Sequence, residues 1–181
     1  MSWPNFPRLL LALALAGLTA GCFQPLYGDR ASVGGSTITD KLSSVDVAAI
    51  DAPNGTRLSR VSVEVRNGLI YEMTGGGPAA ATNYRLDVKL SSSNLQVIVD
   101  VNTARPDIQN YGIDATYVLT DVTTGKPVVK GSTFSRVSYD IPGQQQRFAG
   151  DRALRDAENR AAKVIAENIR SRLASYFTAG T

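Results

Sequence analysis

Few side chains in this sequence could do covalent or acid–base chemistry. Cys22 is the only cysteine among 181 residues, and there is no histidine. Without histidine, neither a Ser-His-Asp triad nor a Cys-His pair can form, and no cluster has the ligand spacing of a zinc site. Paired carboxylates could still cleave a glycosidic bond, but the acidic residues stand mostly among basic neighbours, which is typical of a solvated surface. We therefore expect that the chain is not an enzyme and holds no metal.

The residues before Cys22 have the order of a secretion signal. Arg8 provides a short positive region, residues 9–16 form the apolar run LLLALALA, and small residues lead up to the cysteine at Ala20 and Gly21. The apolar run is about half as long as the ~20 residues that a spanning helix needs. The pattern predicts a signal peptide over residues 1–21 and no transmembrane anchor.

Cys22 with its small preceding residues resembles the lipobox of bacterial lipoproteins. The resemblance implies a diacylglyceryl thioether on Cys22 and an acyl chain on its freed amine, with no other cofactor. For a lone cysteine the alternative is a free thiol or an intermolecular disulfide. Two or more acyl chains anchor stably, because each buried methylene contributes about 0.8 kcal/mol. Phe23 stands at the position where an aspartate retains many lipoproteins in the inner membrane. The absence of aspartate there implies that the protein is anchored in the outer membrane, on its periplasmic face.

The residues after the leader are expected to form a tether and one domain. Residues 22–44 are rich in glycine, serine and threonine and predict an extended tether, and residues 45–181 suit a single core. Because Arg8 is the only charged residue of the leader, 18 basic and 16 acidic residues remain. This small excess does not indicate a nucleic-acid partner.

Hydrophobic periodicity predicts the elements of the domain. An apolar run over residues 45–52 predicts a strand, and helical spacing with a cap at Thr56 favours a helix over 57–73, although Val61, Val63 and Val65 also alternate as in a strand. The glycines at 75–77 lack the Gly-Lys-Ser/Thr of a phosphate loop and are expected to end this helix in a flexible loop.

The second half predicts three strands and a long helix. Residues 84–90 alternate, and the apolar phase flips beyond residues 91–94, which predicts a bulge within a long strand. Residues 113–119 and 128–139 are expected strands joined by a turn at 121–126, although Phe134 falls out of phase. A helix capped by Asp151 should follow, because apolar residues recur at three- and four-residue steps; these are Leu154, Ala157, Ala161, Val164, Ile165, Ile169, Leu173 and Tyr176.

These elements predict an α+β fold. The order β-α-β-β-β-α indicates a two-layer α/β sandwich, in which a four-stranded, mostly antiparallel sheet has both helices on one face. On the wetter flanks of the last helix, Asp156–Arg160 and Lys163–Glu167 are expected ion pairs, because residues four apart are neighbours on a helix.

Several sequence stretches resemble the LptE family of lipopolysaccharide-assembly lipoproteins, in its alphaproteobacterial type. They are Gly21-Cys22-Phe23-Gln24-Pro25-Leu26-Tyr27-Gly28, Pro53-Asn54-Gly55 with Leu58-Ser59-Arg60 and Val65-Arg66-Asn67, and Asp156-Ala157-Glu158-Asn159-Arg160-Ala161-Ala162. Their order along the chain matches the predicted elements. The family fold has a four-stranded sheet and two helices, which implies a helix over residues 57–73.

The resemblance also implies a function and two site residues. Family members plug the LptD β-barrel, assist its assembly and bind lipopolysaccharide through basic residues on two loops. Arg105, between expected strands, and Arg147, before the last helix, match these positions, and a guanidinium suits the lipid A phosphates because it donates two parallel charge-assisted hydrogen bonds. The alternatives are solvated loop arginines for the site, and an accessory lipoprotein of a phospholipid or other envelope transporter for the function.

Overall fold

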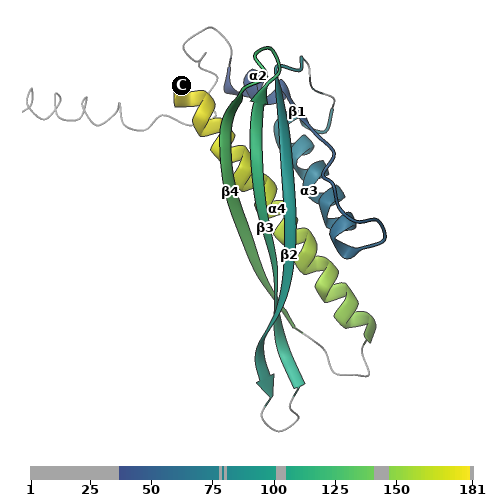
Figure 1. Ribbon diagram of the computed structural model, residues 1–181. Coiled ribbons are helices and arrows are strands. Elements are labelled where there is room, and N and C mark those ends of the chain that lie inside the picture. The colour runs from purple at the N-terminus through teal and green to yellow at the C-terminus, as the bar shows by residue number, and fades with distance from the viewer. Residues whose placement is uncertain (1–36, 78, 80, 101–104, 141–146, 180–181) are drawn as a thin grey trace, which may run out of the picture. The chain divides into compact units, whose positions relative to one another are not determined.

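The computed structural model describes residues 37–77, 79, 81–100, 105–140 and 147–179. The expected signal peptide, Cys22 and most of the expected tether lie outside the described residues. The elements, in chain order, are α2 (Ile38–Ser43), β1 (Val45–Val47), α3 (Arg57–Thr74), β2 (Tyr84–Asp100), β3 (Arg105–Asp121), β4 (Pro127–Asp140) and α4 (Arg147–Ala179), as Figure 1 shows.

The four strands form one mixed sheet in the order β1-β2-β3-β4. Strand β1 pairs parallel to β2, and α3 is the crossover between them; the pairings of β2 with β3 and of β3 with β4 are antiparallel. Helix α3 packs on β1 and β2, and α4 packs on β3, β4 and α3, so both helices cover one face of the sheet (Figure 1). The predicted α+β two-layer sandwich is therefore confirmed.

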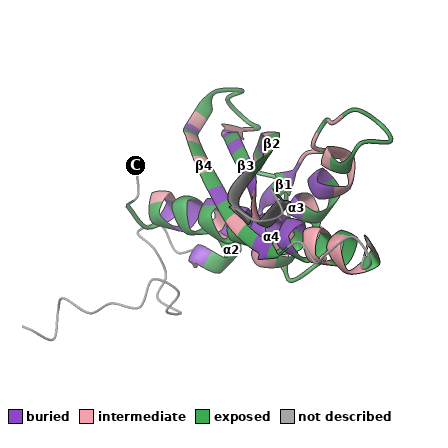
Figure 2. Cartoon of the chain, turned by 90° about the horizontal axis from the view of Figure 1, so that it is seen from below, coloured by how far each residue is buried: buried purple, intermediate pink, exposed green. Residues whose placement is uncertain are grey.

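The core lies between the sheet and the two long helices. Alternate residues of β3 point into it, because side chains along a strand alternate between the two faces; Figure 2 shows the buried residues gathered between the layers. The fully buried large aliphatic residues are Val45, Val61, Val65, Leu69, Leu86, Ile113, Leu119, Ile165, Ile169 and Leu173. Each contributes roughly 1.5–3 kcal/mol on burial, which fixes the helices to the sheet.

Local sequence signals explain where α3 begins and ends. The Thr56 hydroxyl accepts a hydrogen bond from the Ser59 backbone N–H at 3.2 Å, as the predicted cap requires. At the other end, Gly75 adopts the left-handed conformation with φ of 72°, and its N–H donates to the Tyr71 carbonyl at 2.9 Å. Glycine suits this position because it has no Cβ to clash. The helical prediction for residues 57–73 is confirmed over the alternating strand.

Helix α2 lies in the segment that the sequence predicted as an extended tether. Thr37 and Asp40 form a capping box: the Asp40 N–H donates to the Thr37 hydroxyl at 3.1 Å, and the Thr37 N–H donates to the Asp40 carboxylate at 3.0 Å. Ile38 and Leu42 are buried. The Thr-x-x-Asp spacing was the available signal for this helix.

Three predicted boundaries were wrong. Strand β3 begins at Arg105, eight residues before the expected start at residue 113. Strand β1 ends at Val47 instead of residue 52, because its register with β2 stops at Val47 opposite Leu86. After it, the Ala48 N–H donates to the Leu86 carbonyl at 3.0 Å. Helix α4 begins at Arg147, so Asp151 lies within the helix and is not its cap. Gly150 marked the expected start because glycine is unfavourable inside a helix by about 1 kcal/mol, a cost that the rest of this 33-residue helix outweighs.

The bulge expected in β2 lies further along than the sequence suggested. The pairing of β2 with β3 runs without interruption from Tyr84 opposite Asp121 to Gln96 opposite Gln109, and the register shifts come after Gln96. Leu95 is therefore 60% exposed on the outer face of the sheet. At Leu95 the change in apolar phase is an exposed leucine, which a period-two pattern cannot distinguish from a change of face.

The turn of the β3–β4 hairpin lies where the sequence predicted it. Its turn contains Gly125 with φ of 67°, and the Gly125 N–H donates to the Asp121 carbonyl at 2.8 Å. Phe134 is out of phase because it points away from the core; it is 65% exposed, and the Arg136 guanidinium lies 5.5 Å from the centre of its ring. This distance permits a cation–π contact on the outer face.

Candidate functional site

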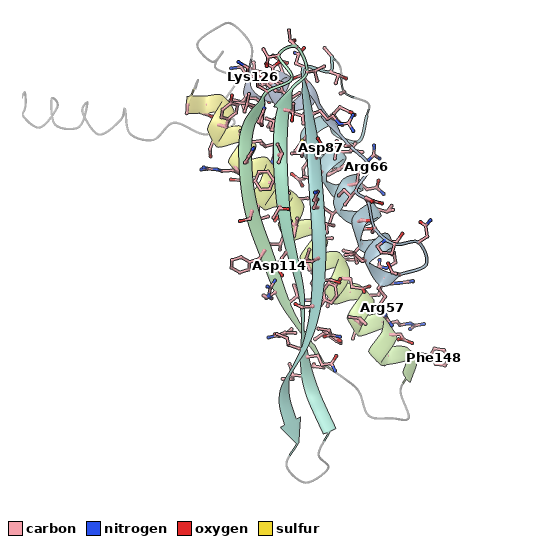
Figure 3. The ribbon with its side chains drawn as sticks, in the orientation of Figure 1. Arg57, Arg66, Asp87, Asp114, Lys126 and Phe148 are labelled. Carbon is pink, nitrogen blue, oxygen red and sulfur yellow. The ribbon has the colours of Figure 1, made fainter. Side chains whose placement is uncertain are left out.

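A hollow of about 570 Å³ lies between the start of α3 and the first turns of α4. We call it the arginine hollow. Figure 3 shows Arg57 of α3 and Phe148 of α4 at the same end of the helix layer. The residues that line the hollow are Gly55, Thr56, Arg57, Arg60, Phe148, Asp151, Arg152, Arg155 and Glu158.

Helical spacing places these side chains on facing surfaces. Arg57 and Arg60 are three residues apart on α3, so they lie on one face of that helix. On α4 the spacing of Phe148, Arg152 and Arg155 follows the same rule. Because α3 and α4 pack directly against each other, residues almost a hundred positions apart in the sequence meet at one site.

A buried ion pair forms one wall of the arginine hollow. The Glu158 carboxylate is only 2% exposed, and Arg60 donates to its Oε2 through Nη2 and to Asn159 Oδ1 through Nη1, the latter at 3.0 Å. A buried carboxylate costs several kcal/mol unless it is paired. Glu158 Oε1 nevertheless accepts no hydrogen bond within the described part of the chain, and Arg57 Nη1 lies 4.0 Å from it.

Three arginines of the hollow retain free donor capacity. Arg57 is 63% exposed, and its guanidinium lies 3.8 Å from the Asp151 carboxylate and 4.0 Å from that of Glu158. Arg152 and Arg155 are exposed, and neither has an ion pair or side-chain hydrogen bond to any other residue that the structure describes. Four guanidinium groups against two carboxylates leave a local charge of about +2 at neutral pH.

Tyr111 lies on the sheet within the electrostatic reach of this ion pair. It is 4% exposed. Burial raises the pKa of its hydroxyl above the ordinary value, and the Glu158 carboxylate also raises it, whereas the Ser92 side chain, Arg60 and Arg57 lower it in part. The hydroxyl therefore stays protonated at neutral pH and remains a hydrogen-bond donor.

The chemistry that this arrangement supports is the binding of an anion. Guanidinium groups bind carboxylate or phosphate through paired, charge-assisted hydrogen bonds. Over the described ranges of the chain, no group of three or more His, Cys, Asp or Glu side chains is arranged to hold a metal ion. No helix among the described residues is both long and apolar enough to cross a membrane.

The residues predicted from the sequence lie near the boundaries of elements. Arg105 is the first residue of β3, where its backbone pairs with Asp100, and Arg147 is the first residue of α4. Both expected loops are therefore shorter than predicted. Cys22 and the side chains of Arg105 and Arg147 lie outside what the structure describes.

Arg57, Arg152 and Arg155 were not among the site residues predicted from the sequence. For Arg57 the available signal was its position at the start of the expected helix, where the helix dipole disfavours cations; Arg152 and Arg155 lie beyond the first turn of α4 and carried no such signal. Arg57 is the first residue of α3, and Arg152 is the sixth residue of α4. This signal does not show that α3 and α4 face each other.

A family model described as "LptE: Lipopolysaccharide-assembly" matches residues 42–173. This range covers β1, both long helices through most of α4, and the three long strands. No curated protein matches the chain.

Solved structures share the fold. A protein of Caulobacter crescentus CB15 described as a lipoprotein has a TM-score of 0.62 at 23% identity, over 80% of this chain and 97% of its own. Rare lipoprotein B of Shewanella oneidensis has a TM-score of 0.50 at 15% identity, over 72% and 93%. Lipoprotein B of Nitrosomonas europaea has 0.51 at 11% identity, over 76% and 90%. At these identities the likeness shows the fold alone.

Proposed function

We propose, since this chain belongs to the LptE lipopolysaccharide-assembly family, that it plugs an LptD-type β-barrel and binds lipopolysaccharide during its insertion into the outer leaflet. As a family member the chain is a lipoprotein of lipopolysaccharide assembly in the cell envelope and not an enzyme. The observation that carries the proposal is the match over residues 42–173, which spans nearly all of the described sheet and helices.

The face of the sheet that the helices leave uncovered supports the proposed role as a barrel plug. Residues on this face are mostly polar and exposed, including Lys89, Thr116, Lys130 and Ser132. Arg136 Nη2 crosses from β4 to the Asp114 carboxylate of β3 at 2.8 Å. The interior of a membrane barrel is polar, and polar groups enclosed there need hydrogen-bond partners. A polar sheet face that carries its own ion pair suits that environment.

The proposed anchor is lipid on Cys22, at the periplasmic face of the outer membrane. Acyl chains on the first mature residue would hold the domain next to a barrel in the same membrane. Because two or more chains give stable anchoring, the protein would search for its partner within the membrane plane. Phe23 supports outer-membrane sorting, because it stands where an aspartate retains many lipoproteins in the inner membrane.

Recovery of the partner tests this function. We expect the tagged full chain, extracted from outer membrane with detergent, to co-purify with a large β-barrel protein, and depletion of the chain to remove lipopolysaccharide from the cell surface. The matched control is Cys22→Ala, which lacks the acceptor sulfur and should recover less barrel. Recovery of inner-membrane transporter subunits alone would contradict the plug and support an accessory role in another transport system.

Charge reversal at Arg105 tests the proposed lipid contact. We expect Arg105→Asp to bind lipopolysaccharide at least about tenfold more weakly, because a hydrogen bond to a charged group contributes ~1.5–3 kcal/mol. The melting temperature should stay unchanged. Lys130→Asp, at an exposed position of β4, is the control for general charge effects. Unchanged lipopolysaccharide binding by a folded Arg105→Asp protein would show that Arg105 is not part of the site. The same assay with Arg147→Asp tests the second proposed residue.

A further inference from the structure

We infer that the arginine hollow binds a phosphorylated sugar headgroup, with Arg57, Arg152 and Arg155 on the phosphate and Phe148 against the apolar part of the same molecule. This inference rests on the proposed function, which supplies an acylated, phosphorylated glycolipid as the ligand. It adds a site on the helix layer to the contacts expected from Arg105 and Arg147.

Charge complementarity specifies the phosphate. The two carboxylates of the hollow leave about two of its four guanidinium charges uncompensated, and a phosphate monoester carries ≈ −1.5 to −2 at pH 7. Arg152 and Arg155 are exposed and have no side-chain partner within the described residues, so their donors can bind without breaking an existing contact. Arg57 has only long contacts, at 3.8 and 4.0 Å.

The position of Arg57 at the start of α3 also favours an anionic ligand. The start of a helix carries positive partial charge from unpaired N–H groups, so a cation there is unfavourable and an anion is favourable. Arg57 is the first residue of α3, and Gly55 and Thr56 before it also line the hollow. A bound phosphate would relieve the repulsion between Arg57 and this helix end.

Glu158, in the wall of the hollow, favours a ligand that contains a sugar. Glu158 is 2% exposed, lines the hollow and has an oxygen, Oε1, that accepts no hydrogen bond from the described residues. A buried acceptor without a donor costs about 1–3 kcal/mol. A hydroxyl or amide N–H beside the phosphate would satisfy this oxygen, and an acylated amino sugar presents both groups.

The exposed ring of Phe148 favours an amphiphile over a free anion as the ligand of the hollow. Its side chain is 84% exposed at the edge of the hollow, although burial of an aromatic ring is strongly favourable. Inorganic phosphate would leave the ring in water. A ligand with apolar substituents next to its phosphate can cover the ring and should therefore bind more tightly than phosphate alone.

The test measures binding of three probes to the purified full chain in detergent. The probes are diphosphorylated lipid A, the same lipid without phosphates, and inorganic phosphate. We expect Arg152→Gln/Arg155→Gln to bind diphosphorylated lipid A at least about tenfold more weakly than the wild type, since each lost charge-assisted bond contributes to affinity. Binding of the dephosphorylated lipid should change little, and Phe148→Ser should weaken binding of both lipids.

Lys163→Gln/Arg172→Gln is the matched control, because it removes two exposed charges from α4 outside the hollow. Equal affinity of the two double variants for diphosphorylated lipid A would overturn the site. Wild-type binding of inorganic phosphate as tight as that of lipid A would overturn the amphiphile as the ligand. If the wild type bound no lipid A at all, the lipid-binding part of the proposed function would fail. If the wild type bound lipid A normally and the Arg152→Gln/Arg155→Gln variant bound it equally well, only the site in the hollow would be refuted.

Discussion

Arg60→Met is expected to lower the free energy of unfolding by about 3–5 kcal/mol, the range observed when one partner of a buried ion pair is removed. Glu158 is 2% exposed, and Arg60 donates a hydrogen bond to Oε2 of its carboxylate. Methionine keeps much of the apolar volume of the arginine stem but supplies no donor. Arg57, 4.0 Å from Oε1 and mostly exposed, can offset only part of the loss. Urea denaturation followed by circular dichroism measures the effect.

Two comparisons isolate the buried ion pair. Arg160 pairs with Asp156 at 2.6 Å on the same helix, but these side chains are 51% and 66% exposed, so Arg160→Met should cost about 1 kcal/mol or less. Arg60→Met/Glu158→Leu should recover most of the stability, because an apolar pair often replaces a buried ion pair without loss. Equal effects of Arg60→Met and Arg160→Met would show that burial of Glu158 does not govern the result.

Ile169→Ala is expected to lower the free energy of unfolding by about 2–5 kcal/mol, the range found when a large core residue is reduced to alanine. Ile169 has no exposed surface and lies on α4, which packs on α3, β3 and β4. The loss therefore combines the transfer of the removed methyl and methylene groups with a cavity between the two layers. Thermal and urea unfolding of the same variant should agree in sign.

Val164→Ala on the same helix is the control for this effect. The hydrophobic pattern placed Val164 in the apolar stripe with Ile165 and Ile169, but its side chain is 38% exposed. We expect a change within about 0.5 kcal/mol, as for most surface substitutions. A loss as large as that of Ile169→Ala would mean that Val164 is covered in the folded protein.

Periodicity identified most elements because a helix or strand requires one buried face. The alternating residues of β3, Tyr111 to Leu119, are all buried, and the stripe of α3 was recognised through Val61, Val65 and Leu69. The predicted pairs Asp156–Arg160 and Lys163–Glu167 both form, at 2.6 and 3.8 Å. These features depend on residues within two turns or one strand of each other, which the spacing alone specifies.

Boundaries were less well predicted because short-range preferences compete there with packing. Gly150 and Asp151 together suggested the start of the last helix, yet α4 continues through them to Arg147. In β2 the apolar phase suggested a bulge near residues 91–94, although an exposed Leu95 produces the same pattern. Helix α2 had a capping box but only two buried residues, too few to give a periodic signal.

The sequence by itself determined the helix and strand faces, the hairpin turn and the absence of histidine chemistry, since each depends on residue type or on neighbours close along the chain. Only the tertiary structure decided that Arg60 and Glu158, 98 positions apart, form a buried pair, and that Arg57 meets Arg152 and Arg155 around one hollow. The physical reason is that helix packing sets which side chains meet, and the angle and register of two helices depend on the whole core between them.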